Sequence, residues 1–466
     1  MKKVDSRSKA LPWLAAVAFF MQALDNTILN TAIPNVAEHL QTTPLAMRAA
    51  IISYALTVGM LIPISGWLAD RFGTKKIFII AVFLFTLGSL FCAMSPSLTA
   101  LVIARIIQGI GGAMMMPVSR LAILRAYPKN ELLGILNFIA IPGLVGPVLG
   151  PFLGGLIVTY LTWHWIFLIN IPIGIVGILF ARKAMPNFTM PKRKFDIIGF
   201  FFFGSSLVLL SIGISAIAEN EDYLLLPFSL LFSGLALLAF YYFYAKDNEN
   251  VLIRLSLFDN RVYLIGIIGN IAARLGIACI PFLMPLMLQI GFGYSPIEAG
   301  MLMAPMAIGS ITAKSIVSKL LRRWGYRHTL QGVTISLSIM ISLFYFQTPE
   351  HSLWLLVGPL FLLGVLMSIQ FTSMNTLTLG SLDNNYASEG NSLMAVTQQV
   401  SISFGIGISA AVLSIYSYLF SHLPVIDHFH YTFVTMGAIT LVSTLIFSLL
   451  KAEDGNVLLN RSGNSE

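Results

Sequence analysis

The stretch Gly66-Trp-Leu-Ala-Asp70-Arg71-Phe-Gly73-Thr-Lys75-Lys76 concentrates charge between two apolar runs, at about 49–68 and 77–95. A second stretch, Ser318-Lys-Leu-Leu-Arg322-Arg323-Trp-Gly325-Tyr-Arg327-His328, repeats its leucine, arginine, glycine and basic positions at a constant offset of 252. This copy has no acid at the place of Asp70. Internal repeats of this kind are typical of membrane proteins built from two related halves.

The composition of the chain excludes most classes of soluble protein. Of its 466 residues 57% are hydrophobic and only 10% are charged, and the mean hydropathy is +0.83. Soluble domains carry roughly 25% charged residues, so a cytosolic enzyme, a nucleic-acid-binding protein and a disordered regulator are all excluded. The two cysteines, Cys92 and Cys279, lie in apolar runs and are too few for a disulfide framework or a metal site. The expected partner is the lipid bilayer.

Fourteen apolar runs with few charges follow one another along the chain, and a spanning helix needs about 20 residues. We expect helices, because irregular backbone cannot face lipid and the runs lack the period-two alternation of barrel strands. The first run continues to Pro34 with no small-residue cleavage site, which predicts an uncleaved span. The runs lie at about 11–33, 49–68, 77–95, 98–121, 133–159, 163–181, 197–217, 225–245, 263–290, 297–318, 329–347, 352–378, 390–418 and 430–450.

Basic residues predict the orientation of these spans. With the N-terminus in the cytoplasm, 25 of the 28 Lys and Arg residues fall in cytoplasmic segments or at their helix ends, as positive residues do in membrane proteins. The repeat falls on the tenth span rather than the eighth, so a helix pair is inserted between the halves, with its 219–222 loop outside. The expected parts are an N-terminal six-helix bundle (1–181), a linker with two additional helices (182–262), a C-terminal six-helix bundle (263–450) and a cytoplasmic tail (451–466).

Three further motifs stand in order with the 66–76 stretch. They are Leu24-Asp25-Asn26-Thr27-Ile28-Leu29-Asn30-Thr31-Ala32-Ile33-Pro34, Arg105-Ile-Ile-Gln108-Gly109-Ile-Gly111-Gly112-Ala113 and Gly146-Pro-Val-Leu-Gly150-Pro151-Phe-Leu-Gly154-Gly155. Together the four resemble the motifs of the major facilitator superfamily, in its fourteen-span drug–proton antiporter branch. The chain departs from that branch at His164, where arginine is usual between two tryptophans, and at Thr74, where a basic residue is common.

The resemblance implies an all-α integral membrane protein, a major facilitator bundle of about 14 helices arranged 6+2+6 with both termini cytoplasmic. It implies a monomeric secondary transporter of the bacterial inner membrane that exports small molecules or drugs by alternating access. The sequence has no nucleotide-binding loop of the form G-x-x-x-x-G-K-[ST]. The proton gradient is therefore the expected energy source, with protons and a small-molecule substrate as partners and no cofactor.

Charges inside apolar runs point to function, because each costs roughly 2.5–3.5 kcal/mol to insert. Asp25 lies deep in the first run and is the expected proton carrier, whereas Arg105 keeps its proton and must stay paired or face water. Arg274 lies about one turn from the position related to Asp25 by the repeat, so we expect both to line one cavity; the alternative is a local pair or snorkelling. The expected coupling and cavity residues are Asp25, Arg105, Arg274, Gln22, Asn26, Gln108 and Gln398.

Two motifs predict gating elements. The first is a charge latch at the cytoplasmic face, and its alternative is simple anchoring by positive residues; its residues are Gly66, Asp70, Arg71, Gly73 and Lys75. The second is a bent helix whose glycines recur every four residues, so another helix can approach its bare face; ordinary tight packing is the alternative. Its residues are Gly146, Pro147, Gly150, Pro151, Gly154 and Gly155.

Two other functions remain open at this stage. The charges of Arg105 and Arg274 against Asp25 sum to +1, which favours an exporter of organic anions or metal chelates, for example citrate, free or metal-bound. A membrane sensor or structural partner without flux is the other alternative. The longest expected cytoplasmic segments are only about 15 residues, which disfavours it.

Overall fold

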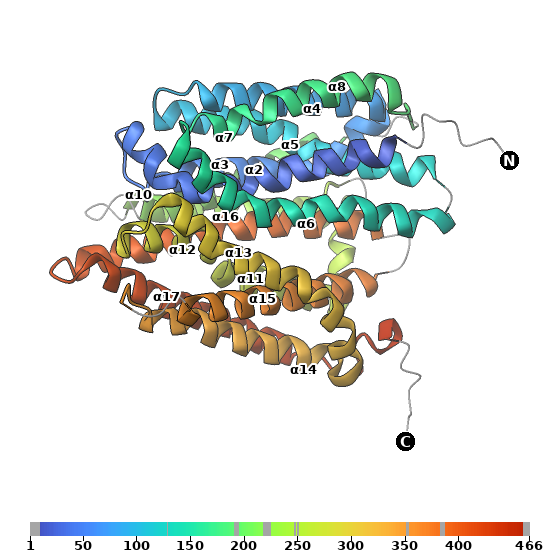
Figure 1. Cartoon of the computed structure of the whole chain (residues 1–466). Coiled ribbons are helices and arrows are strands. Elements are labelled where there is room, and N and C mark those ends of the chain that lie inside the picture. Colours follow the sequence, from blue (N-terminus) through green and yellow to red (C-terminus); the bar gives the residue numbers. More distant parts are fainter. Residues whose placement is uncertain are drawn as a thin grey trace. The chain divides into compact units, whose positions relative to one another are not determined.

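The computed structural model describes residues 10–127, 129–190, 195–217, 225–246, 248, 251–350, 354–382 and 387–459. Side chains are described for all of these except 129–134, 136, 137, 140–144, 147, 148, 387, 388 and 457. All regular elements in these ranges are helices (Figure 1). The described residues form two compact units, the first from the 1–195 part with Ser295–Met301 and the second from the remainder.

The first unit is a bundle of long helices, with α2 packed along α6 and α5 packed between α3 and α4. Figure 1 shows these helices lying lengthwise beside one another. Its core contains Tyr54, Phe78 and Phe85, all essentially inaccessible to solvent. The helices are α2 (Leu11–His39), α3 (Arg48–Phe72), α4 (Thr74–Ala93), α5 (Leu98–Ala126), α6 (Lys129–Tyr160), α7 (Trp165–Leu168) and α8 (Asn170–Ala184).

The second unit contains a helical hairpin, α9 (Ile197–Ile217) with α10 (Leu225–Lys246), which packs through α9 on α16. Only 17% of the apolar window of α10 is buried, as expected for a helix that faces lipid. The remaining elements belong to this unit, except that α13 belongs to the first unit as far as Met301. They are η1 (Leu255–Asp259), α11 (Arg261–Ile277), α12 (Ile280–Leu286), η2 (Met287–Gly291), α13 (Pro296–Thr312), α14 (Lys314–Leu343), η3 (Phe344–Phe346), α15 (Trp354–Gly380), α16 (Ala387–Leu419), α17 (Val425–Ser448) and η4 (Asn456–Leu459).

Local sequence explains several of these boundaries. Ser97 begins α5 by accepting a hydrogen bond from the backbone N–H of Ala100, and Asn260 begins α11 by accepting one from Tyr263. Pro172 has no N–H to donate to Leu168, which explains why α7 and α8 are separate segments of one apolar run.

Every apolar run predicted from the sequence falls on one or more of these helices. Eleven helices of the described chain are long and apolar enough to cross a membrane. The helices α2, α6 and α13 are not among the eleven. Gln22, Asp25 and Asn26 lower the mean hydropathy of α2, and α13 has only 17 residues. The predicted 219–222 loop lies outside the described residues.

The two copies of the repeat make the same backbone turn. Gly73, between α3 and α4, has φ of 96°, and Gly325, inside α14, has φ of 74°. Only glycine adopts such angles without strain. Gly325 therefore divides α14 into two helical segments, 314–324 and 326–343, just as Gly73 separates α3 from α4.

Candidate functional site

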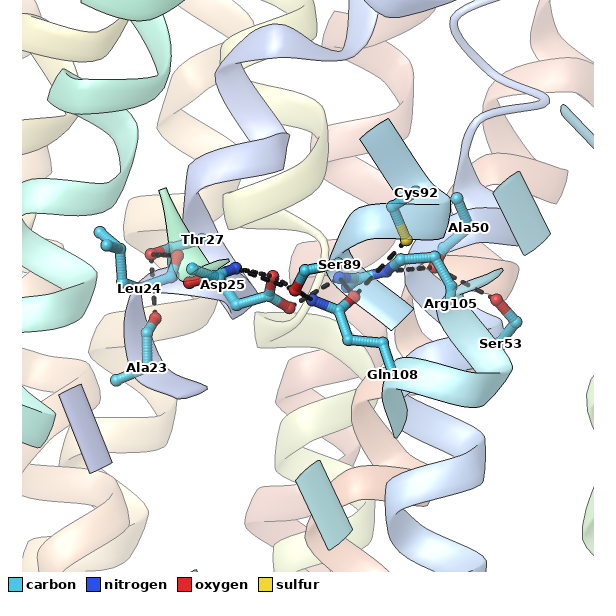
Figure 2. A network of polar contacts seen from close by, with 11 residues as sticks. Ala23, Leu24, Asp25, Thr27, Ala50, Ser53, Ser89, Cys92, Arg105 and Gln108 are labelled. Carbon is cyan, nitrogen blue, oxygen red and sulfur yellow. Dashed lines mark hydrogen bonds and ion pairs between the residues drawn. The ribbon is translucent and has the colours of Figure 1, made fainter. Parts of the chain in front are cut away.

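A buried ion pair joins α2 to α5. Nη1 of Arg105 lies 2.6 Å from Oδ2 of Asp25, and the two side chains are 2% and 0% exposed. Figure 2 shows them pointing toward one another from their helices. Each charge alone would be very costly at this depth, and the partner neutralises it.

The carboxylate of Asp25 accepts hydrogen bonds from three side chains (Figure 2). Gln108 donates from Nε2 to Oδ1 of Asp25 at 2.8 Å and to Ser89 Oγ at the same distance, while its Oε1 accepts from Arg105 at 2.6 Å. Asn170 donates from Nδ2 to Oδ1 of Asp25 and to Ser89 Oγ, each at 3.3 Å. Both carboxylate oxygens are therefore occupied, as a buried charge requires.

Further contacts hold the guanidinium of Arg105 against α3. Its Nε donates to the carbonyl of Ala50 at 3.2 Å. Its central carbon Cζ lies 4.2 Å from the ring centre of Tyr54. A Cβ on Gly112 would lie only 2.6 Å from the Tyr54 hydroxyl, so glycine is needed there for α5 to approach this closely. Besides the Asp25 carboxylate, Arg105 thus has neutral contacts that include Gln108, Ala50 and Tyr54.

The structure brings together three of the predicted coupling residues, Asp25, Arg105 and Gln108. Gln22 is buried one turn before Asp25, whereas Asn26 is exposed. Ser89 and Asn170 were not expected in the site. Their only signal in the sequence is that each is a polar residue within an apolar run.

Asp70, one residue of the predicted charge latch, forms an ion pair within the first unit. Asp70, near the end of α3, lies 2.6 Å from Arg125, near the end of α5. Arg71 lies over the ring of Trp67, at 5.0 Å from its centre. Lys75 donates from Nζ to the backbone carbonyl of Arg182 at 2.6 Å.

The segment Met185–Met190, which follows α8, covers the turn at Gly73. Thr74 donates from its backbone N–H to Phe188 O at 3.1 Å and from Oγ1 to Pro186 O at 2.9 Å. The N–H of Lys75 donates to Asn187 Oδ1 at 3.3 Å, and a Cβ on Gly73 would collide with Asn187. Sequence reasoning missed this segment. At this position, where the family often has a basic residue, the hydroxyl of Thr74 binds the 185–190 segment.

Three glycines of the second gating motif, Gly146, Gly150 and Gly154, line the face of α6 that packs on α2. A Cβ on Gly146 would lie 2.6 Å from Ala23, and one on Gly150 or Gly154 would collide with Thr27 or Ile28. Thr31 donates from Oγ1 to the carbonyl of Pro151 at 2.9 Å.

The other motif glycines differ in how crowded they are. A Cβ on Gly155 would meet the carbonyl of Pro296, which belongs to the same unit. Gly66 has open space around it, with no atom within 4 Å of an added Cβ. The side chain of Pro147 lies outside the described residues.

Comparison with known proteins decides the family. The family model described as "Major Facilitator Superfamily" matches residues 15–406. The chain belongs to this superfamily. It is 44% identical, over 94% of both chains, to "Putative multidrug resistance protein MdtD" of Pectobacterium atrosepticum, and 43% identical, over 97% of both, to the protein of the same name in Klebsiella pneumoniae. The solved structure of a D-xylose–proton symporter shares the fold, with a TM-score of 0.67 over 95% of this chain and 97% of that one at 15% identity.

These findings confirm the resemblance predicted from the motifs. The protein is a transporter of small molecules and not an enzyme, with a helical bundle embedded in the membrane. It is a multi-pass protein of the bacterial inner membrane.

Arg274 of this superfamily transporter lies in the second unit, on α11. Its Nε donates to Asn270 Oδ1 at 2.7 Å, and its guanidinium lies 4.0 Å from the ring centre of Phe371 on α15. No carboxylate among the described residues lies within ion-pair distance of it. Gln398, in the same unit, donates from Nε2 to Asn375 Oδ1 at 3.1 Å and so links α16 to α15.

An aromatic cluster of His39, Trp163 and His164 lies where α2 ends and α7 begins. The ring of His164 stacks on that of Trp163 at 4.0 Å, and His39 approaches His164 at 5.5 Å. Burial, and then the neighbouring His39, lower the pKa of His164 from its ordinary value. In the part of the chain that the structure describes, no cluster of three or more His, Cys, Asp or Glu residues could bind a metal.

Proposed function

We propose that this transporter exports small molecules, drugs among them, in exchange for protons, with the buried Asp25–Arg105–Gln108 network as its coupling site. The observation that carries the proposal is a fully buried carboxylate whose only charged partner, among the described residues, is an arginine on another helix. Protonation of Asp25 would remove the charge that Arg105 binds. Arg105 already contacts Gln108, Ala50 and Tyr54, so it has alternative partners once the ion pair is lost.

The packing of α2 supports a mechanical role for the same helix. One side of α2 presents Asp25 to α5, and residues on either side of Asp25, Ala23 and Thr27, pack on the glycines of α6. A change in the Asp25–Arg105 pair therefore bears directly on the α2–α6 contact. We infer that α6 bends and seals the site in this way, and that the Asp70–Arg125 pair latches the cytoplasmic side.

We propose fourteen spans arranged 6+2+6, with α9 and α10 as the inserted pair and both termini in the cytoplasm. The helices α2, α6 and α13 add to the eleven apolar ones, and the distribution of basic residues supports this count. The parts are those expected from the sequence: 1–181, 182–262, 263–450 and 451–466. The transporter acts as a monomer, and the proton gradient supplies the energy without a cofactor.

One observation favours a second candidate, the export of organic anions or metal chelates. Asp25 is already neutralised by Arg105, which leaves Arg274 as an intramembrane cation with no described acid beside it. A carboxylate substrate would supply that partner. The first candidate remains preferred, because the curated relatives are described as multidrug resistance proteins.

Counterflow in proteoliposomes distinguishes the two candidates. Vesicles are loaded with ethidium or with citrate, and uptake of the same labelled compound is followed. The first candidate predicts rapid exchange of ethidium and of other cationic dyes. Exchange confined to citrate and related acids would replace it by the second. A protein that exchanges neither class, although folded, would favour a non-transporting sensor.

The substitution Arg274→Gln tests the second candidate at its own residue. An anion exporter should lose about two orders of magnitude in affinity for citrate, because several kcal/mol are lost when a buried carboxylate has no cation. A cation exporter should keep or improve its ethidium flux, because repulsion falls. Unchanged citrate flux in the variant would contradict the anion site, and lost ethidium flux would contradict the repulsion argument.

A further inference from the structure

Asn170 has an unusual pattern of hydrogen bonds. It is 1% exposed, and its Nδ2 donates to both Asp25 and Ser89. Its Oδ1 is buried and has no partner among the described residues. Buried acceptors without a donor are rare in native proteins, and each calls for an explanation.

The position of Asn170 supplies that explanation. Its amide lies beside the buried carboxylate of Asp25, whose Oδ1 holds no proton while Asp25 is ionised. A carboxyl group that gains a proton becomes a donor and needs an acceptor. Rotation of the Asn170 amide by half a turn places Oδ1 where Nδ2 now lies, 3.3 Å from Asp25 Oδ1.

We propose that Asn170 is a positioning residue that reads the protonation state of Asp25. With Asp25 ionised, Nδ2 of Asn170 donates to the carboxylate. When Asp25 takes a proton on Oδ1, the amide turns and its Oδ1 accepts the new O–H. The inference rests on the proposed coupling role of Asp25 and adds a second residue to it.

The place of Asn170 in the fold gives this switch a consequence. Asn170 is the first residue of α8, directly after Ile169, where α7 and α8 separate, and two positions before Pro172. Turning the Asn170 amide therefore replaces a hydrogen bond donated to Asp25 on α2 by one accepted from it. This change occurs at the junction of α7 and α8. Ser89 on α4 shares both donors, Gln108 and Asn170, so α4 takes part in the same exchange.

Infrared difference spectra between alkaline and acid pH test the proposal. Purified wild type should show the carbonyl stretch of a protonated carboxyl on acidification, and Asp25→Asn should lack it. In Asn170→Ala and in Asn170→Leu this band should move to higher frequency, since the O–H has lost its acceptor. Asn170→Ser, which keeps a group that can donate and accept, should restore the band toward its wild-type position. Thr86→Ala, a packing change between α4 and α8 that does not touch Asp25, should leave it in place.

Transport gives the second readout. Asn170→Ala and Asn170→Leu should lose at least tenfold in uphill export driven by a pH gradient, with recovery in Asn170→Ser. An Asp25 band that is present but unmoved in a folded Asn170 variant would overturn the switch alone. Absence of any Asp25 band in wild type would overturn the proposed coupling site and the switch with it.

Discussion

At the scale of single residues, Asp25 and Arg105 are two buried charges that stabilise each other. Within the described part of the chain, each has the other as its only ion-pair partner. Removing one partner leaves the other charge buried and unpaired, which costs more than the pair itself contributes.

Arg105→Ala should therefore destabilise the folded protein by about 3–5 kcal/mol, whereas the double variant Asp25→Asn/Arg105→Gln should recover most of that loss. The measurement is thermal unfolding of the detergent-purified proteins. Equal stability of Arg105→Ala and wild type would mean that the ion pair is not buried as described.

Asp25, Arg105 and Gln108 could be predicted from the sequence, because charged and amide side chains within apolar runs are expensive and so conspicuous. Ser89 and Asn170 could not. A serine or asparagine in a membrane helix often satisfies itself locally, and only the folded chain reveals which neighbour it contacts. Asn26 is exposed although Asp25 is buried, because adjacent helical positions point about 100° apart, and its place in a substrate cavity stays a prediction.

At the scale of helices, the close packing of α6 on α2 depends on glycines, which have no side chain to hold the two helices apart. Gly146, Gly150 and Gly154 leave room for Ala23, Thr27 and Ile28. The spacing of the glycines predicted a bare helix face, but it carried no information on which helix would cover it. The segment Met185–Met190 over the Gly73 turn was likewise unpredictable, since short extended segments have no periodic pattern.

Gly150→Leu should separate α2 from α6 and destabilise the protein by about 1–3 kcal/mol, the usual cost of overpacking. Transport should fall with it, because Asp25 lies on the helix that is displaced. Gly332→Leu is the matched control, since no atom lies within 4 Å of a Cβ at Gly332. If Gly150→Leu unfolds at the wild-type temperature and transports at the wild-type rate, the close packing of α2 on α6 is not needed for function.

At the scale of the whole molecule, hydropathy was sufficient to predict an all-helical membrane protein, because the bilayer admits few other structures. The eleven apolar helices and the family agree with that prediction. The number of spans is harder to predict from hydropathy, because the polar residues around Asp25 lower the mean hydropathy of α2.

The fourteen-span topology predicts that the loop between α9 and α10 faces the periplasm. Asn220→Cys, in a background carrying Cys92→Ala and Cys279→Ala, should react with a membrane-impermeant thiol reagent added to intact cells. A cysteine placed at Asn187, on the opposite side of the membrane, should react only after permeabilisation. The reverse pattern would contradict the inserted helix pair.

The central claim is that Asp25 couples export to protons, and uphill transport by inside-out membrane vesicles with an acidified lumen tests it most directly. Ethidium is the probe, or citrate if counterflow identifies an anion. We predict that wild type concentrates the compound in the lumen, whereas Asp25→Asn exchanges it in counterflow but does not concentrate it. Accumulation by Asp25→Asn to the wild-type level under the same pH gradient would contradict the account.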